Sequence, residues 1–480
     1  MIGITSYSAY IPWYRLSRAK MNEATGFLMN FPPPGERSVA NQNEDSVTMA
    51  TAAGIYCLDG EDRSQVGGLY FATSTPSYLV RQHASIVSTA LDLREDIRVA
   101  DFASSNKAGT TALMNALDAV KAGSMKSALV SAADCRVVKP GHPQEFVYGD
   151  GAAAFMVGQD DVVAELEATY SLSVDFVDRW RAVFEEFEHS WEDRWIRDEG
   201  YEKLIPRAIN GMLQHQGLAA GDIAKVAYCY PNARAHGALA KKMGFAPAQV
   251  QDNLLEKVGD TCAAWPLMML AGALEEAKPG DRILVASYGQ GVDVLLFKVT
   301  DQIGKMKDKW GIKKNLARRK ELESWERFAS MRGSVKFYLG PRDQEYGFTS
   351  YSMAWRERKQ LSRLYGHKCK KCGTAQFPPR RICVNPNCKA IDQMEDYRFA
   401  TRTGKVFSVV VDYNVTVPVP PVVHAYINFD GGGRINMQVV DVDPFAVQIG
   451  MPVEMTYRRK LVDIARGVSI YYWCATPVRQ

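Results

Sequence analysis

The chain has 480 residues, and its 58 lysines and arginines against 54 aspartates and glutamates leave a formal net charge of +4. This balance is not that of a strongly basic nucleic-acid binder or an acidic tail protein. With 46% hydrophobic and 23% charged residues, the composition is typical of a soluble globular protein rather than a disordered one. About 150 residues per domain predict roughly three folding units.

Short apolar runs alternate with helical stretches from residue 1 to about residue 300. We predict buried strands at 66–72, 127–132, 225–230 and 282–287. Helices are predicted at 108–123 and 262–277, and the second ends at Lys278-Pro279-Gly280. This alternation predicts an α/β fold with a largely parallel sheet.

A weak internal repeat divides this region. The strand and Gly-rich turn at 127–135 lead to an apolar run at 148–158, and 282–291 lead to 292–299 in the same way. The pattern predicts two similar halves. Between them, the aromatic and charged segment 176–201 is expected to form a helical cap over the rim of a pocket.

The last third of the chain changes character. Residues 301–345 are dense in Lys, Arg and Glu and predict a solvated helical connector. Residues 346–400 hold a basic amphipathic helix and a cysteine cluster, and 401–480 carry short β-rich runs separated by turns such as Asp430-Gly431-Gly432-Gly433. We expect the final segment to form a small β-barrel.

Four of the nine cysteines are clustered, and the other five are scattered along the chain and odd in number, which argues against a disulfide framework. The cluster is Cys369-x2-Cys372-x10-Cys383-x4-Cys388. Four thiolates can surround Zn²⁺ completely, so we predict a structural zinc ribbon without catalytic function, with iron as an alternative metal.

The basic segment 356–381 admits two kinds of partner. It carries nine Lys or Arg residues against one Glu. Beside a zinc ribbon and a barrel, such a segment is compatible with nucleic acid, but basic patches also bind other polyphosphates, including coenzyme A. Composition leaves these two readings open.

Several motifs resemble known families. HKCKKCGTAQFPPRRICVNPNC with the following GKVFSVVV resembles the acyl-CoA-associated zinc-ribbon/OB-fold family. GITSYSAYIPWYRL, NKAGTTAL, YGDGAAAFMVG, YPNARAHGALAKKMGF and SYGQGVDVLLF resemble the 3-hydroxy-3-methylglutaryl-CoA (HMG-CoA) synthase branch of the thiolase superfamily. The resemblance implies a five-layer αβαβα thiolase fold over 1–300, an OB-fold at the C-terminal end and acyl-CoA thioester substrates. It also implies a homodimer, with a further thiolase-type subunit as an alternative partner, and nucleic acid is then not expected.

The chain differs from these families at the positions of their catalytic residues. Where the family carries a Cys nucleophile, this chain has Asn106. The family's His corresponds to Cys229, its catalytic Glu falls on Ser74, and an Asn of related synthases becomes Asp260. A carboxamide is not a nucleophile at neutral pH, so position 106 cannot carry an acyl group.

These departures lead to one main prediction and two alternatives. We expect a cytoplasmic enzyme, without a membrane partner, that stabilises a thioester enolate at the helix start after Asn106 and cleaves β-hydroxyacyl-CoAs by a retro-aldol reaction. The alternatives are HMG-CoA-synthase-like condensation with a relocated nucleophile, Cys229 or Cys262, and a non-catalytic CoA-binding partner. Catalytic candidates are Asn106, Cys229, Asp260 and Tyr288. We consider Tyr228 and Tyr230 weaker candidates for the base, and we expect His236 to be structural.

Overall fold

The computed structural model describes residues 1–28, 32–338 and 350–479. They form two compact units. The first comprises Met1–Ala40, Asp45–Ser88 and Leu93–Val335, and the second comprises the residues from Lys336 onward with Asn41–Glu44 and Thr89–Asp92. None of the helices in the described residues has the length and apolar character needed to cross a bilayer.

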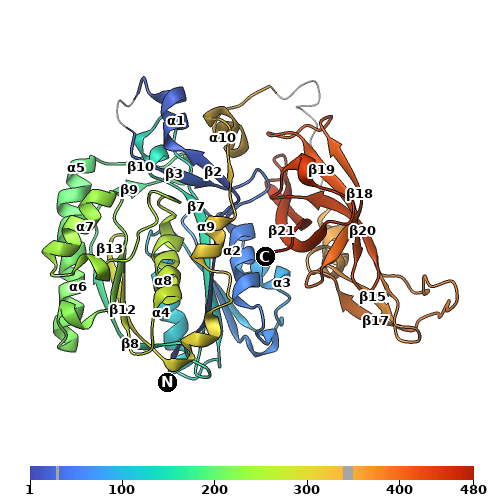
Figure 1. Cartoon of the computed structure of the whole chain (residues 1–480), viewed down its shortest axis with the longest axis horizontal. Coiled ribbons are helices and arrows are strands. Elements are labelled where there is room, and N and C mark those ends of the chain that lie inside the picture. Colours follow the sequence, from blue (N-terminus) through green and yellow to red (C-terminus); the bar gives the residue numbers. More distant parts are fainter. Residues whose placement is uncertain (29–31, 339–349, 480) are drawn as a thin grey trace. The chain divides into compact units, whose positions relative to one another are not determined.

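The first unit is built on one nine-stranded sheet that consists of two similar halves (Figure 1). One half has the order β1-β7-β6-β4-β5, with bounds Gly3–Tyr10, Asp150–Gly158, Ala128–Cys135, Gly68–Ala72 and Arg98–Phe102. The other has the order β8-β13-β12-β11, with bounds Ala164–Ser173, Gly291–Val299, Arg282–Tyr288 and Lys225–Tyr228. The halves join where Gly3 and Ile4 pair with Glu165 and Ala164.

Corresponding strands pair in the same way in both halves. β6 is antiparallel to β7 and parallel to β4, just as β12 is antiparallel to β13 and parallel to β11. The predicted internal repeat is therefore confirmed. The four predicted strands correspond to β4, β6, β11 and β12, and the predicted α/β class is also confirmed. The expectation of a largely parallel sheet is wrong: five of the eight strand pairings in this sheet are antiparallel, because β7 and β13 return antiparallel beside β6 and β12 and the two halves join through an antiparallel pair.

Helices complete the layers of the first unit (Figure 1). α4 (Ala108–Lys121) and α8 (Trp265–Glu276) pack against each other in the middle, where their residues belong to one buried apolar cluster. α2 (Ser46–Cys57) covers β1, β6 and β7, while α6 (Glu202–Gln216) covers β8, β12 and β13. α8 is apolar on nearly all sides because it is buried on all sides. The outcome is the predicted αβαβα arrangement.

The segment after β13 belongs to the first unit and is not a solvated connector. It forms η7 (Asp301–Met306), α9 (Ile312–Ala317), β14 (Lys320–Glu321) and α10 (Trp325–Arg332). β14 joins a small sheet with β2 (Tyr14–Ser17) and β3 (Glu36–Val39). The widely spaced apolar residues of the whole segment, Ile312, Leu322 and Phe328, are all buried. Residues 339–345 of the predicted connector lie outside the described residues.

The second unit contains the ribbon and the barrel. The expected basic helix is divided into α11 (Tyr351–Arg356) and α12 (Arg358–Leu361). A three-stranded sheet follows, with β15 (Tyr365–Cys369) between β16 (Ala375–Gln376) and β17 (Met394–Arg398). The closed barrel has the order β18-β19-β20-β22-β21, with bounds Gly404–Asp412, Val422–Phe429, Arg434–Val439, Val468–Pro477 and Pro452–Asp463. This confirms the predicted zinc-ribbon and OB-fold architecture.

The four clustered cysteines have the geometry of a closed zinc site. The Sγ atoms of Cys369, Cys372, Cys383 and Cys388 all lie within 4.8 Å of one another. Cys369 Sγ is 3.9 Å from Cys388 Sγ, and Cys372 Sγ is 3.5 Å from Cys383 Sγ. Zn–S bonds of about 2.3 Å in a tetrahedron place sulfurs roughly 3.8 Å apart, so these residues fit a structural Zn²⁺.

We predict about one zinc and no stoichiometric iron per chain in elemental analysis of protein purified under reducing conditions. Cys383→Ser removes one ligand and should abolish zinc retention and make residues 350–400 protease-sensitive. The control is Cys474→Ala, which alters a buried barrel cysteine and should retain the metal. Metal-free wild-type protein, or full zinc retention by Cys383→Ser, would contradict the assignment.

Candidate functional site

A cavity of about 590 Å³ lies within the first unit. Ser74, which follows β4, and Asn106, which precedes α4, line it, together with Gln290 from the turn between β12 and β13. Residues 76–79 and 104–105 add to the wall, and the segment around β9 (Arg179–Trp180) completes it with Arg179 and Glu188 among its residues. The part of 176–201 that lines the cavity is a two-stranded ribbon of β9 and β10 (His189–Ser190), and helical structure begins only at Asp193.

Asp134 joins the loop after β4, which lines the cavity, to the backbone just before α8. This buried carboxylate at the end of β6 accepts hydrogen bonds from Thr73 Oγ1 at 2.8 Å and from the backbone N–H groups of Ser74 and Thr75 at 2.7 and 2.9 Å. Its second oxygen accepts from Ala263 N at 2.9 Å. Burial raises the pKa of Asp134, and these donors partly offset the shift. The carboxylate therefore joins the β4 loop to the start of α8.

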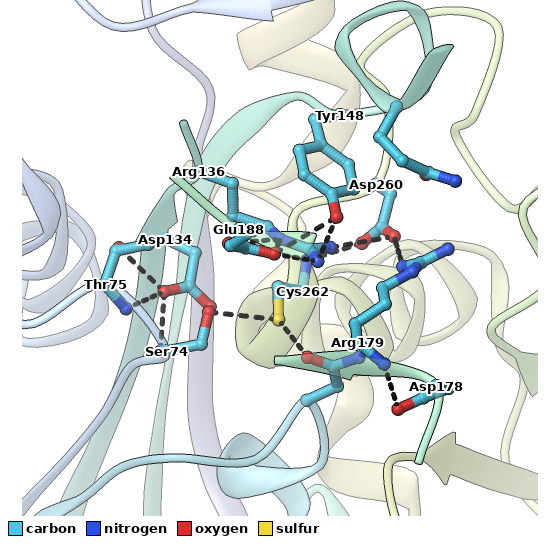
Figure 2. A network of polar contacts seen from close by, with 12 residues as sticks. Ser74, Thr75, Asp134, Arg136, Tyr148, Asp178, Arg179, Glu188, Asp260 and Cys262 are labelled. Carbon is cyan, nitrogen blue, oxygen red and sulfur yellow. Dashed lines mark hydrogen bonds and ion pairs between the residues drawn. The ribbon is translucent and has the colours of Figure 1, made fainter. Parts of the chain in front are cut away.

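Arg136 occupies the centre of a buried ion network (Figure 2). Its guanidinium lies 2.6 Å from Glu188 Oε2 and 3.1 Å from Asp260 Oδ2, and it stacks 3.5 Å from the ring centroid of Tyr148. Burial by itself would raise the pKa of Glu188, but the charge of Arg136 holds that pKa below its usual value. Glu188 is therefore ionised at neutral pH.

Arg179 approaches the same network from the opposite side of Asp260 (Figure 2). Its Nη1 lies 3.2 Å from Asp260 Oδ2, so this one carboxylate oxygen contacts two guanidinium groups. The other oxygen, Oδ1, accepts a hydrogen bond from Cys262 N at 2.8 Å. Asp260 thus fixes the backbone just before α8.

Cys262 lies directly behind the cavity wall. Its Sγ donates to Asn106 Oδ1 at 3.0 Å and accepts from Ser74 Oγ at 3.2 Å, and both partners line the cavity. The backbone of Cys262 has φ +51°, a region that non-glycine residues rarely adopt. Burial raises the pKa of its thiol well above the usual value, although Arg136 lowers it in part.

The four catalytic candidates from the sequence occupy different places. Asn106 lines the cavity, and Asp260 lies within the ion network beneath it. Cys229 is buried in the apolar core, where burial raises the pKa of its thiol. Tyr288 is buried beside Tyr201, with ring centroids 4.3 Å apart. Neither Cys229 nor Tyr288 is among the described residues that line the cavity.

The other candidates weighed from the sequence have structural surroundings. Tyr228 donates a hydrogen bond to the backbone carbonyl of His236, and the two rings lie 4.3 Å apart. Burial lowers the pKa of His236 to about 4, so this imidazole is neutral at physiological pH. Tyr230 packs against Tyr201 at 5.2 Å.

A glycine allows the Gly-rich turn after β12 to approach Asn106. A Cβ at Gly289 would lie 2.8 Å from Lys107 N and 3.1 Å from Asn106 N, closer than real side chains tolerate. Ser105 Oγ donates to the Gly289 carbonyl at 3.3 Å, and Lys107 is tied to Asp293 by a 2.9 Å ion pair. The Gly-rich turn after β12 and Asp293 of β13 therefore hold the turn that carries Asn106 in place.

Sequence reasoning missed Asp134, Arg136, Tyr148, Arg179 and Glu188. Asp134 and Arg136 could have been suspected because they end or follow the predicted strand 127–132, where polar groups collect in α/β sheets. Glu188 and Arg179 stand among many charged residues in 176–201, and nothing in the sequence distinguishes them.

Comparisons with solved structures define the class of protein. The fold matches an HMG-CoA synthase complexed with CoA at a TM-score of 0.62 and 20% identity, over 73% of this chain and 94% of that one. It matches 3-oxoacyl-[acyl-carrier-protein] synthase III from Aquifex aeolicus at a TM-score of 0.54 and 20% identity, over 62% and 100%. Residues 213–296 match the synthase III C-terminal family model. The first unit thus has the fold of these thiolase-type synthases.

Sequence relatives define the family. The chain is 31% identical to the hydroxymethylglutaryl-CoA synthase of Methanopyrus kandleri over 70% of this chain and 98% of that protein. It is 30% identical to the hydroxymethylglutaryl-CoA synthase of Methanocaldococcus jannaschii over 70% of this chain and 100% of that protein. The chain belongs to the hydroxymethylglutaryl-CoA synthase family. Its ribbon and barrel match the ChsH2 rubredoxin-like zinc ribbon (356–394) and the ChsH2 C-terminal OB-fold (397–458).

We predict that Arg136→Gln lowers the free energy of unfolding by about 3–5 kcal/mol, because Glu188 and Asp260 would remain buried without their shared cation. Urea unfolding followed by tryptophan fluorescence measures the change. The matched control is Arg282→Gln, which breaks a partly exposed 2.8 Å pair with Glu167 and should cost about 1 kcal/mol or less. Equal costs for the two variants would contradict a central role for Arg136.

Proposed function

We propose that the chain condenses acyl-CoA thioesters by HMG-CoA-synthase-type chemistry and that Cys262 is the residue that carries the acyl group. One observation supports this most: Cys262 Sγ lies 3.0 Å from Asn106 Oδ1, beside the position where the family resemblance places its nucleophilic cysteine. The main prediction from sequence is retro-aldol cleavage, with condensation as an alternative. The family membership favours condensation.

The two-fold repeat gives this relocation a physical basis. Asn106 lies just before α4 in one half, and Cys262 lies just before α8, the corresponding helix of the other half. Because α4 and α8 pack side by side, the residues just before them lie close together, with Asn106 at the cavity wall and Cys262 directly behind it. A thiol at either helix start therefore reaches almost the same point.

The acyl transfer step balances without a further reagent. The Cys262 sulfur attacks the thioester carbonyl, the bond between that carbon and the CoA sulfur breaks, and the thiol proton leaves with CoA. Asn106 covers the sulfur and must rotate aside for the thioester to reach it. Because burial raises the pKa of Cys262, the thiolate is scarce at neutral pH, so acylation should accelerate as pH rises.

Glu188 supplies the carboxylate that condensation requires. Forming the carbon–carbon bond requires a base to remove a proton from the carbon next to a thioester carbonyl. Glu188 lines the cavity and is kept ionised by Arg136, whereas the family's Glu position is Ser74, which cannot act as a base at neutral pH. We assign Glu188 this role, with Arg136 as its positioning residue.

We predict an acetyl adduct on Cys262 when full-length protein is exposed to acetyl-CoA, quenched in acid and examined by intact-mass and peptide mass spectrometry. Cys262→Ala should form no adduct, and its condensation rate should fall at least about 1,000-fold. Cys229→Ala alters a buried thiol away from the cavity and should retain both. In wild-type protein, the adduct should form roughly tenfold faster per pH unit between about pH 6 and 8.

For Glu188, we predict that Glu188→Gln slows exchange of the acetyl-CoA methyl protons with deuterium oxide by at least about 100-fold. The matched control is Glu185→Gln, because Glu185 lines the same cavity but faces His189 at 2.8 Å rather than Arg136. NMR of the acetyl group measures exchange independently of acyl transfer. Equal exchange in the two variants would remove Glu188 from the mechanism.

A second candidate, retro-aldol cleavage of a β-hydroxyacyl-CoA without an acyl-enzyme, rests on a different observation. The side chain at the cavity wall is the Asn106 amide, while the sulfur is buried behind it. Release of an aldehyde or ketone with a shorter acyl-CoA, and no adduct on the protein, would favour this reaction. We also propose a homodimer, on the family resemblance, which light scattering can test.

A further inference from the structure

The C-terminal part of the chain concentrates its positive charge. Residues 350–480, which hold the ribbon and the barrel, carry 19 Lys and Arg against 10 Asp and Glu, whereas residues 1–349 carry 39 against 44. A zinc ion held by four thiolates carries two net negative charges, which offset only part of this excess. A polyanion is the kind of partner that such a charge attracts.

The outer face of three neighbouring barrel strands, β18, β19 and β20, is free of carboxylates (Figure 1). Strand pairing places nine of its side chains in three cross-strand rows, and a bulge in β18 adds Phe407. The rows are Lys405-Asn428-Arg434, Ser408-Tyr426-Asn436 and Val410-His424-Gln438. All ten residues are among those that the structure describes, and all are exposed or half-buried. This outer face is therefore open to a partner.

The outer face combines aromatic rings with cations. The Arg434 guanidinium lies 3.7 Å from the ring centroid of Phe407, and a 2.6 Å hydrogen bond to Asn428 Oδ1 holds it there. Tyr426 lies one row further along and is 46% exposed. Nucleotide bases stack on aromatic rings and on guanidinium planes, while Lys405 and Arg434 attract phosphates.

The ribbon adds a second group of the same kind. The Tyr397 ring of β17 is faced by Arg402 at 4.9 Å and by Lys368, from the basic segment 356–381, at 5.8 Å. A Cβ on Gly431, in the turn between β19 and β20, would lie 3.7 Å from the Tyr397 hydroxyl. Since β20 begins soon after this turn, cations and rings continue from the ribbon to the outer face.

We propose that the outer face and the Tyr397 group together bind single-stranded nucleic acid, a function separate from acyl transfer. Rings interleaved with cations suit a chain in which bases and phosphates alternate. A single nucleotide would use only part of this surface, and a duplex keeps the faces of its bases stacked inside. An acidic polypeptide would pair with the cations and leave the rings unused. The composition of 356–381 admits nucleic acid, and the outer face favours it.

The first test is fluorescence anisotropy of a labelled oligothymidylate of about 12 nucleotides, titrated with full-length protein. Four cations face this surface, and neutralising three or four phosphates should make the affinity fall about 20- to 50-fold between about 50 and 200 mM KCl. The matching duplex should bind at least about tenfold more weakly, and inorganic polyphosphate should compete poorly, because neither presents a free base.

Matched variants separate stacking from charge. Tyr426→Ala should weaken binding about tenfold and leave its salt dependence unchanged. Arg434→Gln should weaken binding and also reduce the slope of log affinity against log salt by about 0.7, the share of one phosphate. The controls are Tyr413→Ala, an exposed ring outside the three rows, and Lys460→Gln on β21, and neither should change the affinity. Circular dichroism verifies that each variant is folded.

Several results would overturn this assignment. One is the absence of oligonucleotide binding to micromolar protein at about 50 mM KCl. Another is an equal loss of affinity in Tyr413→Ala and Tyr426→Ala, or equal binding of polyphosphate, since either leaves only nonspecific charge. Displacement of the oligonucleotide by micromolar CoA would assign the surface to a single nucleotide instead. Acyl transfer is not measured in any of these experiments, so their failure leaves the proposed function unaffected.

Discussion

The buried guanidinium of Arg136 is the constraint on which the candidate site depends. A cation without water must be matched by anions, and Glu188 and Asp260 supply them at 2.6 and 3.1 Å. Because Asp260 also holds Arg179 and the backbone of Cys262, the charge balance fixes both the cavity wall and the start of α8. The same network keeps Glu188 ionised. One ion network therefore determines both the ionisation of Glu188 and the positions of the cavity wall and the start of α8.

The two-fold repeat explains how an enzyme family can lose a nucleophile without losing the site. Two equivalent helices begin next to each other, so Asn106 and Cys262 are neighbours although 156 positions separate them. Asp134 maintains this geometry by joining the β4 loop to Ala263. Under the proposed relocation, position 106 is free to hold an amide, and the Asn106 oxygen accepts a hydrogen bond from the Cys262 thiol.

Apolar runs and cysteine spacing were enough to predict individual elements, such as β12 and the zinc ribbon, whereas the five-layer arrangement and the OB-fold were predicted from the family resemblance. The candidate site could be predicted only in part. Asn106 and Asp260 stood in recognisable motifs, but the contact between Asn106 and Cys262 depends on how two distant helices pack. Glu188 and Arg179 lie in a charged segment whose ribbon structure has no clear periodicity, and its expected helical cap begins only at Asp193. The connector around Leu322 is buried because few, widely spaced apolar residues suffice to attach it.

Timing is the most direct test of the central claim that Cys262 carries the acyl group. In a rapid-quench single turnover with carbon-labelled acetyl-CoA, the label should appear on the peptide that contains Cys262 at least as fast as product forms, and then decline. Release of product while the protein remains unlabelled throughout would contradict the account.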